Sequence, residues 1–373
     1  MASKTKILIL YASAGHGHEK AAMAVDAECR ASGTYDVNLV DVLALTSFGF
    51  GGRYRALYFF MIRRIPWLWG FFYAVMDQNW VYFFVRPLRR LNNHFFVRRL
   101  EALVESESPD VIVSTHFLPT EVVSYLKRKG RVNGRLTTVV TDYMPHAFWI
   151  TTECDAYAVA TQLTKEEMKR RGVGEEKIRV TGIPIELKFS MPLTRDDASR
   201  SLGLDPSVFT ALITSGGAGV GIARPLVERL AILEPPIQQL VVCGTNKPLL
   251  AELRNKYAGR PRFHFYGFVD NIHELMTASD LIVGKGGGLT ITESLCVGRP
   301  MVLFGAVPGQ ETRNVDQVAG YGAAKAAGSL REVVEHVTAF RQDVRIYHEA
   351  VTAIEKIRRP HSAREIVHLA LGD

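Results

Sequence analysis

The feature that most constrains this chain is a strand, a glycine-rich turn and a helix, which follow one another and then recur. Residues Lys6–Tyr11 form a short apolar β run, Ser13–His18 a glycine turn and Glu19–Ala31 a helical stretch, before a second strand at Tyr35–Val42. This order is typical of a parallel α/β sheet, whose ligands bind at the carboxyl ends of the strands. We therefore expect an α/β protein whose sites lie at sheet edges.

The alternation continues to the end of the chain, with one interruption. Residues 184–206 carry three prolines among charged and small residues, which predicts a linker. We predict two Rossmann-like domains facing a central cleft, at 1–190 and 191–373. A last helical segment, about Leu330–Leu371, could pack back on the first domain. Further strands are predicted at Val111–Ser114, Thr137–Thr141, Tyr157–Ala160, Ile178–Thr181, Phe209–Thr214, Gln239–Cys243, Arg262–Tyr266, Leu281–Val283 and Met301–Phe304.

Composition excludes several classes of protein. With 373 residues, 47% of them hydrophobic, the chain is long enough for two cores and is neither disordered nor a small disulfide scaffold. Its cysteines, Cys29, Cys154, Cys243 and Cys296, form no CxxC pair, which favours a reducing compartment. The start shows no signal-peptide pattern, and no run of about 20 apolar residues predicts a spanning helix. We expect a cytoplasmic protein.

The positive charge is concentrated in one window. Residues 46–100 hold nine arginines and a single acidic residue, Asp77, so this window carries a charge of +8. The rest of the chain carries about −1, which gives the net charge of +7. Many Trp, Phe and Tyr residues lie in the same window, an arrangement that suits the headgroup region of an anionic bilayer. A buried pair of helices with arginines on the solvent-exposed face explains the composition equally well. RNA binding through stacked aromatics is a weaker third interpretation, because no RNA-binding signature accompanies it.

The first glycine turn carries two histidines, His16 and His18. It lacks the third glycine of the dinucleotide fingerprint, since Lys20 stands there, and no metal-ligand partner lies at suitable spacing. A histidine at a helix N-terminus stays neutral and can act as a general base near neutral pH. We favour this role for His18 over an incidental histidine in a turn. Asp142, after the strand that ends at Thr141, could orient a base or bind an acceptor, or be a turn residue.

A second glycine turn, Gly284–Thr290, precedes a helix in the C-terminal half. Its backbone N–H groups would form an anion site, although it is not a Walker loop. Glu293 follows one helical turn later, where a carboxylate could accept ribose hydroxyls, or could simply complement the helix dipole.

Two further turns are candidates for ligand contact. The polar segment Pro308–Glu311 with Asn314 could hold sugar hydroxyls or be only a polar loop. The turn Ser215–Gly221 would let a ligand approach its backbone closely, or is simply a tight turn. No DxD triplet occurs in the chain, so glycine amides and a helix dipole would have to stabilise a leaving diphosphate.

The chain resembles glycosyltransferase family 28, in particular the monogalactosyldiacylglycerol synthases and bacterial diacylglycerol glucosyltransferases. The likeness runs from about residue 5 to residue 325. The peptidoglycan N-acetylglucosaminyltransferase is a more distant relative by the same pattern. The segments that carry it are SAGHGHEKAA, PDVIVSTHFLP, VVTDYMPHAFWI, TGIPI, VVCGTNKPL, GFVDNIHELMTASDLIVGKGGGLTITESL and VPGQETRN.

The resemblance implies a GT-B fold and inverting transfer of galactose or glucose from a UDP-hexose to 1,2-diacylglycerol, without metal or other cofactor. It implies that His18 is the base, with Asp142 as the next candidate, and that the 46–100 window binds the inner face of the membrane. Ala218 departs from relatives with an acid there. The implied or expected donor-binding residues are Gly216, Gly217, Phe268, Val269, Gly286, Gly287, Gly288, Leu289, Thr290, Glu293, Gln310, Glu311 and Asn314. The expected acceptor or membrane residues are Arg63, Arg64, Trp67, Trp69, Phe71, Trp80 and Trp149.

Two other functions remain open from the sequence. One is a transferase with another lipid-linked or soluble acceptor. The other is a non-catalytic lipid-binding protein that keeps this fold, against which the glycine turn, Glu293 and the PGQE segment argue together. No nucleic-acid partner is expected.

Overall fold

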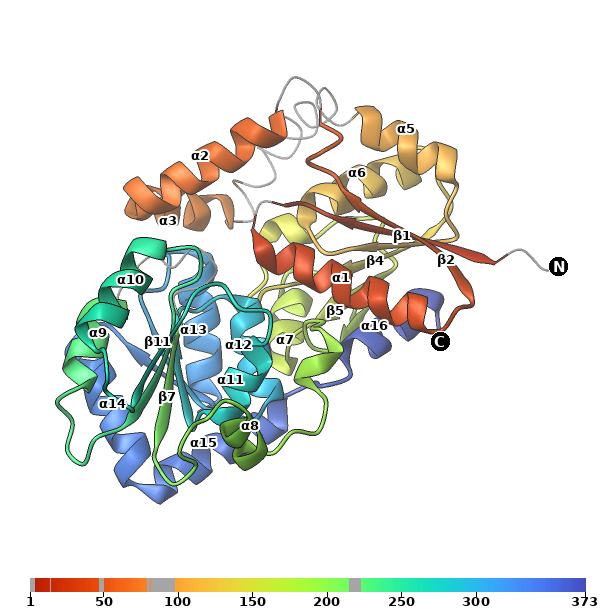
Figure 1. Cartoon of the computed structure of the whole chain (residues 1–373). Coiled ribbons are helices and arrows are strands. Elements are labelled where there is room, and N and C mark those ends of the chain that lie inside the picture. The colour runs from red at the N-terminus through yellow and green to blue at the C-terminus, as the bar shows by residue number, and fades with distance from the viewer. Residues whose placement is uncertain (1–3, 14, 47–49, 79–80, 82–97, 215–222) are drawn as a thin grey trace. The chain divides into compact units, whose positions relative to one another are not determined.

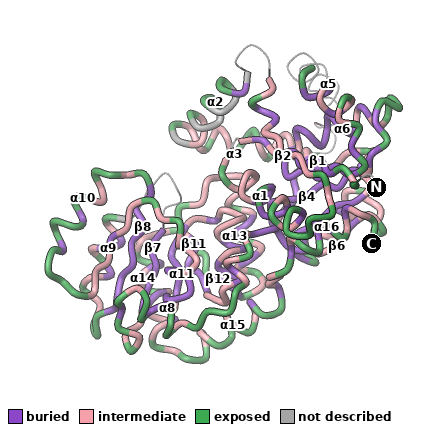
Figure 2. Tube along the Cα trace, turned by 45° about the vertical axis from the view of Figure 1, so that its right-hand side comes forward, coloured by how far each residue is buried: buried purple, intermediate pink, exposed green. Residues whose placement is uncertain are grey.

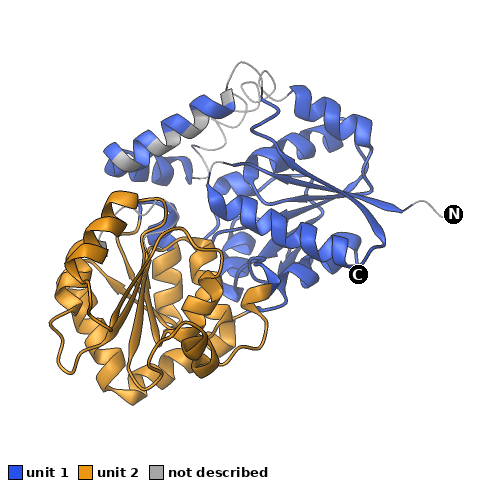
Figure 3. Ribbon diagram, in the orientation of Figure 1, with its two compact units in different colours: residues 1–187, 307–313, 359–373 blue, residues 188–306, 314–358 orange. Residues whose placement is uncertain are grey.

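The computed structural model describes residues 4–13, 15–46, 50–78, 81, 98–214 and 223–373. These residues form two compact units, each built on a parallel sheet (Figure 3). Unit 1 comprises Met1–Leu187, Val307–Arg313 and Arg359–Asp373, and unit 2 comprises Lys188–Ala306 and Asn314–Arg358. The chain therefore leaves unit 1 after residue 187, returns for residues 307–313 and returns again at residue 359.

Unit 1 contains a six-stranded sheet in the order β2-β1-β3-β4-β5-β6, and every pairing is parallel (Figure 1). In the register, Ile7 of β1 lies opposite Val37 of β2 and Val111 of β3. The strands are β1 (Thr5–Tyr11), β2 (Tyr35–Asp41), β3 (Val111–Ser114), β4 (Arg135–Val139), β5 (Ala156–Val159) and β6 (Ile178–Val180).

Both faces of this sheet are buried, because β1 is apolar at successive positions. Ile7 and Ile9 pack with α1 and α16, whereas Leu8 and Leu10 pack with α5 and α6. This follows from the alternation of side chains along a strand. The helices of unit 1 are α1 (His16–Ala31), α2 (Phe50–Arg64), α3 (Pro66–Met76), α5 (Arg98–Glu107), α6 (Phe117–Arg128), α7 (Gln162–Arg170) and α16 (Ser362–Leu371).

Local capping explains where several helices begin. The Nδ1 atom of His116 accepts a hydrogen bond from the amide of Leu118 at the start of α6. Thr161 and Thr164 form a reciprocal capping box at α7. Within the described residues, short 3-10 turns are present at Ala147–Trp149, Glu175–Lys177 and Leu187–Phe189.

Unit 2 contains the second six-stranded parallel sheet, in the order β12-β11-β10-β7-β8-β9. Figure 2 shows its central strands buried between outer helices whose far faces are exposed. The strands are β7 (Thr210–Thr214), β8 (Gln238–Val242), β9 (Phe263–Tyr266), β10 (Leu281–Gly284), β11 (Met301–Phe304) and β12 (Ala324–Ala327). The helices are α8 (Arg195–Ser201), α9 (Ala223–Leu230), α10 (Lys247–Lys256), α11 (Ile272–Ala278), α12 (Gly288–Cys296), α13 (Gln310–Gly320), α14 (Leu330–Gln342) and α15 (Val344–Ile357).

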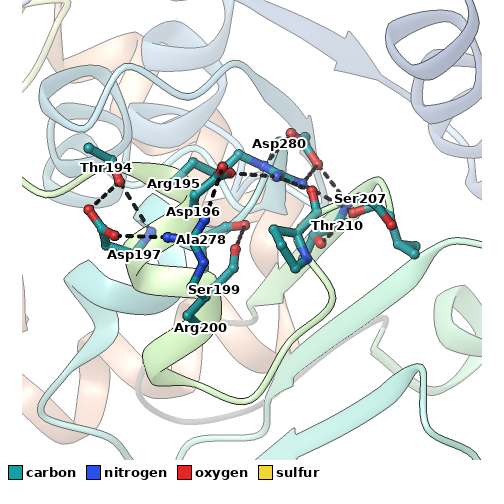
Figure 4. Close-up of polar contacts among 12 residues, drawn as sticks. Thr194, Arg195, Asp196, Asp197, Ser199, Arg200, Ser207, Thr210, Ala278 and Asp280 are labelled. Atoms are coloured by element: carbon teal, nitrogen blue, oxygen red, sulfur yellow. Dashed lines mark hydrogen bonds and ion pairs between the residues drawn. The ribbon is translucent and has the colours of Figure 1, made fainter.

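Two segments differ from the sequence-based prediction. Part of the predicted linker is α8, which is tied to the body of unit 2 because Arg195 donates hydrogen bonds to Asp280 (2.7 Å) and to the Pro206 carbonyl (2.6 Å; Figure 4). The edge strand β12 was not predicted. Its sequence, AKAA, has a helical composition, and pairing with β11 overrides that local preference.

The C-terminal segment is helical, as expected, and consists of α14, α15 and α16. Helix α16 packs on α1 and on strands β3, β4 and β5 of unit 1. The hydroxyl of Ser362 donates a hydrogen bond to the carbonyl of Ile183 at 2.9 Å. Among the described residues, no helix is both long and apolar enough to cross a bilayer.

Candidate active site

His18 lies in the first turn of α1, just beyond the carboxyl end of β1. Its Nδ1 atom is 2.8 Å from the carbonyl oxygen of Thr115 and 2.9 Å from the hydroxyl of Thr141. A carbonyl oxygen can only accept, so Nδ1 carries the proton and Nε2 keeps its lone pair. The hydroxyl of Thr115 in turn donates to the backbone carbonyl of His18 at 2.9 Å, which fixes the turn. The histidine is thus held in the tautomer of a general base.

The surroundings of His18 also favour its neutral form. The rings of His116 and Trp149 lie 4.6 Å and 6.1 Å from its ring, measured between centroids. Burial among these groups lowers the pKa of His18 below its ordinary value of 6.5, and the negative charge of Asp142 opposes that shift. A neutral imidazole with a free lone pair near pH 7 can accept a proton.

Asp142 is buried in the loop after β4, and both of its carboxylate oxygens accept hydrogen bonds. Trp149 Nε1 donates to Oδ2 at 3.2 Å, and Gln310 Nε2 donates to Oδ1. The two sequence candidates for the base, His18 and Asp142, therefore belong to one polar cluster in unit 1. Gln310 joins this cluster because residues 307–313 belong to unit 1.

The segment 307–313 folds back on itself at the start of α13. The carboxylate of Glu311 accepts a hydrogen bond from the amide of Val307 at 2.8 Å. Gly309 has a φ of +99°, a conformation that side chains disfavour. Gln310 and Glu311 are thus carried on a short, strongly constrained turn.

The glycine turn of unit 2 opens α12 without a side-chain cap. Gly287 is the N-cap residue, and a Cβ atom added there would meet nothing within 4 Å. The amides of Gly288, Leu289 and Thr290 lie in the first turn, where helical N–H groups have no partner within the helix. Glu293 lies on the same helix and is half-buried. The arrangement can bind an anion next to a carboxylate.

Asn314 supports this turn from α13. Its side chain is buried, and Nδ2 donates to the carbonyl of Gly286 at 3.3 Å. Both residues belong to unit 2. Asn314 thus braces the glycine turn, whereas Gln310, four residues earlier, contacts Asp142 in unit 1.

The remaining donor-binding candidates lie in loops. Phe268 and Val269 follow β9, and Phe268 is 65% exposed, so its ring is free to contact a ligand. Gly216 and Gly217, together with Ala218, lie outside the described residues.

Helix α3 presents the apolar part of the arginine-rich window. None of its residues is buried; Trp67 and Phe71 are 68% and 60% exposed, and Trp69 is half-buried. Arg64, at the end of α2, is exposed. Arg63 lies on α2 with its side chain outside the described part, and Trp80 falls outside the described residues. Helix α3 therefore exposes large apolar side chains, whereas Leu100 at the end of the window is buried in the core of unit 1.

Trp149 is placed differently from the expected membrane residues. It is 1% exposed and packs against His18 and His116, with its indole N–H on Asp142. A side chain enclosed in this way cannot contact a lipid surface. Trp149 is expected as an acceptor or membrane residue, whereas its ring packs beside the polar cluster of unit 1.

Sequence reasoning missed the residues that orient the cluster. Thr115 and Thr141 hold His18, and both lie where a strand of unit 1 ends, a position that could have singled them out. From the sequence, Asp77 stands out only as the single acidic residue of the basic window, and its ion pairs could not be predicted. In the described part of the chain, no group of three or more His, Cys, Asp or Glu residues is arranged to hold a metal ion.

The comparisons with known proteins agree with this architecture. Residues 18–185 match the family model of monogalactosyldiacylglycerol (MGDG) synthase, and residues 211–326 match that of the glycosyltransferase family 28 C-terminal domain. A processive diacylglycerol beta-glucosyltransferase of Bacillus licheniformis is 29% identical over 98% of this chain and 94% of its own length. The Bacillus cereus protein of the same name is 29% identical over 100% of this chain and 95% of its own length.

Solved structures share the fold at low identity. MurG of Acinetobacter baumannii superposes with a TM-score of 0.63 at 16% identity, covering 100% of both chains. The UDP-GlcNAc 2-epimerase of Neisseria meningitidis, bound to UDP-GlcNAc, also reaches 0.63 at 13% identity, covering 99% of this chain and 100% of its own. The predicted GT-B fold is thereby confirmed. Taken together, the two family matches and the full-length relatives establish that the chain belongs to glycosyltransferase family 28, in the monogalactosyldiacylglycerol synthase and diacylglycerol glucosyltransferase group.

Proposed function

We propose that this protein transfers a hexose from a UDP-hexose to the free hydroxyl of 1,2-diacylglycerol, with inversion at the anomeric carbon, at a membrane surface. The observation that carries the proposal is the His18 cluster, because Thr115 fixes the tautomer that leaves Nε2 available. The names of the curated relatives support the lipid acceptor and the sugar donor.

The proposed reaction is a single displacement. His18 Nε2 takes the proton of the acceptor hydroxyl. At the same time the hydroxyl oxygen attacks the anomeric carbon, and the bond from that carbon to the UDP oxygen breaks. The transition state is oxocarbenium-like, as in other glycosyl transfer chemistry. Asp142 is the electrostatic partner that favours the imidazolium formed in this step. We assign the base to His18 rather than Asp142 because both carboxylate oxygens already accept hydrogen bonds.

The leaving UDP would be held in unit 2. The amides of Gly286–Thr290 and the positive end of α12 would take the diphosphate, and Glu293 the ribose hydroxyls. Phe268 and Val269 would border the uracil, and Gln310, Glu311 and Asn314 would lie toward the sugar. Since backbone amides would carry the charge of the leaving group, we propose that no metal is needed. Transfer that persists in EDTA supports this point, and transfer restored only by added Mg²⁺ or Mn²⁺ overturns it.

The acceptor would be reached through α2 and α3. Exposed Trp67 and Phe71 can enter the headgroup boundary, and the arginines of this window would be attracted to anionic lipid. The cytoplasmic leaflet carries a negative surface potential, which favours peripheral binding on the inner face of the cell membrane.

The test is transfer of radiolabelled sugar into the lipid extract. Purified protein is mixed with vesicles that contain diacylglycerol, and UDP-glucose and UDP-galactose are supplied in parallel. Label from one donor supports the proposal and identifies the hexose, and chromatography of the product counts the sugars added. If neither donor gives label while UDP still binds, the acceptor is a different molecule. If UDP-hexose does not bind, the non-catalytic alternative is favoured.

A further inference from the structure

Helix α3 and the segment 307–313 contact each other closely within unit 1. A Cβ atom added to Gly70 of α3 would lie 2.7 Å from the Cβ atom of Pro308. A Cβ atom added to Gly309 would lie 3.0 Å from the ring of Tyr73. Each partner thus contributes a glycine where the other presents a ring. At Gly70 a side chain would force Pro308 to move, because real Cβ atoms do not approach a neighbour within 3.0 Å, and at Gly309 the φ of +99° also favours glycine.

A buried carboxylate fastens the two parts together. Asp77 follows the last turn of α3 and is 7% exposed, and Arg313 Nη1 donates a hydrogen bond to its Oδ2 atom. Arg171, the C-cap residue of α7, donates to both oxygens, at 2.7 and 2.9 Å, and the amide of Ala147 to Oδ1 at 2.8 Å. The guanidinium of Arg313 also lies 5.2 Å from the centroid of the Tyr73 ring.

This arrangement keeps Asp77 ionised although it is buried. Burial alone would raise its pKa, but the hydrogen bonds from Arg171 and Arg313 and the adjacent His146 outweigh that effect and lower the pKa. A buried carboxylate with several charge-assisted hydrogen bonds holds its partners in one geometry. The end of α3, helix α7 and Arg313 are therefore fixed with respect to one another.

Gln310 lies between these two attachments. Pro308 and Gly309 are held on one side by Gly70 and Tyr73, and Arg313 on the other side by Asp77, while Gln310 itself contacts Asp142. Neither Gly70 nor Asp77 needs to touch a substrate to affect the reaction, because both set the place of the turn that carries Gln310 and Glu311.

We infer that α3 is a positioning element for the segment 307–313, and that Gly70 and Asp77 thereby set how the sugar end of the donor is held. The inference rests on the proposed function. It assigns to the helix that exposes Trp67 and Phe71 a second task, through Gly70 and Tyr73, that no lipid contact requires. A merely structural role would alter stability and leave the donor kinetics alone.

The main test is Gly70→Ala. Alanine stabilises the helix itself, so the variant is expected to fold, yet its methyl group displaces Pro308. We expect the donor KM, and the dissociation constant of UDP-hexose measured by calorimetry, to rise by about 10-fold to 100-fold, as for other small misplacements of binding groups. The KM for diacylglycerol and the binding to vesicles should stay at the wild-type values.

Gly52→Ala is the matched control. It makes the same change in α2, where an added Cβ atom meets nothing within 4 Å, and should leave the donor KM unchanged. Pro308→Gly combined with Gly70→Ala removes the atom that clashes and should recover part of the donor affinity relative to Gly70→Ala. Arg313→Gln, in a partly exposed side chain, should raise the donor KM in the same direction without a change in vesicle binding.

The outcomes separate the inference from the proposed function. If the wild-type protein transfers sugar and Gly70→Ala matches it in donor KM and dissociation constant, the inference is wrong. The inference is also overturned if Gly70→Ala and Arg313→Gln lower the melting temperature but leave the donor KM unchanged. If the wild-type protein binds UDP-hexose but transfers no sugar, the proposed function fails, and the dissociation constants of the variants still decide the inference. Absence of UDP-hexose binding overturns both.

Discussion

The strand ends of the two units differ in the kind of group they carry. In unit 1 they carry side chains that titrate or hydrogen-bond, namely the half-buried His18 and the buried Thr115, Thr141 and Asp142. In unit 2 the turn after β10 carries glycines and backbone amides. Moving a proton requires a side chain whose pKa is set by its surroundings, whereas holding a diphosphate requires donors that stay neutral and approach closely. Under the proposed function, the same sheet architecture would serve two chemical tasks through different residue types.

The largest expected effect comes from removing the base in unit 1. His18→Ala should lower kcat by about 10²–10⁴-fold, because general base catalysis contributes about that much. Binding of UDP, measured by calorimetry, should remain. Because burial lowers the pKa of His18, the acid limb of the wild-type pH–rate profile should lie below pH 6.5. Turnover that survives His18→Ala would transfer the role of base to Asp142, and Asp142→Asn is the variant to compare.

A second effect concerns stability and is again specific to unit 1. His146 is buried, its Nδ1 accepts from the amide of Phe148, and burial lowers its pKa to about 4. The unfolded state, with a pKa near 6.5, binds more protons than the folded state between these values. The free energy of unfolding should therefore fall by about 3 kcal/mol as the pH falls from 7 to 4.

Denaturant unfolding of the whole chain at several pH values checks this expectation. His146→Gln should flatten the dependence of the unfolding free energy on pH between 6.5 and 4. An identical slope in wild-type protein and His146→Gln would show that other groups govern the acid sensitivity.

The third effect addresses unit 2. Glu293→Ala should weaken UDP-hexose binding by about 10-fold to 100-fold, which corresponds to the loss of hydrogen bonds to a charged group, and should change kcat less. Glu335→Ala, on the exposed part of α14, is the matched control. Unchanged donor affinity in Glu293→Ala would leave this carboxylate as a helix-dipole partner only.

The smallest effect is expected at the exposed apolar side chains. Trp67→Ala with Phe71→Ala should weaken binding to vesicles that contain anionic lipid by about 1 kcal/mol, because side chains at the headgroup boundary are withdrawn from water only in part. Ile232→Ala removes an exposed apolar side chain of unit 2, which is 79% exposed, and should not affect flotation. If Ile232→Ala weakens vesicle binding as much as Trp67→Ala with Phe71→Ala does, the exposed side chains of α3 are not a specific lipid-binding surface.

Much of the fold could be predicted, because apolar strands and glycine turns are local signals. The bounds of β3 and β11 agree with the prediction, and the neighbouring strands differ by one or two residues at their ends. Strand β12 could not be predicted from AKAA, since only its pairing with β11 makes it a strand. Helix α8 was hidden by the prolines around it, although Thr194 and the following acidic residues are typical of a helix start.

The site was predictable in its residue types but not in its contacts. His18 and Asp142 end up in one cluster because β1, β3 and β4 are neighbours in the sheet, an order that local sequence does not contain. The partners that set the chemistry, such as Thr115 and Gln310, lie 97 and 168 residues away from the side chains they contact. Trp149, expected as an acceptor or membrane residue, is enclosed by contacts with His18, His116 and Asp142 that its local sequence does not reveal.

The return of α16 to unit 1 has a consequence for synthesis of the chain. Ile366, Val367 and Ala370 cover the face of the sheet that contains Ile7 and Ile9, so strand β1 is covered by a helix that follows the whole of unit 2 along the chain. Because synthesis proceeds at about 5–20 residues per second, that face waits for tens of seconds while the whole of unit 2 emerges and becomes able to fold. A chain that lacks α16 would present this apolar face to chaperones and proteases.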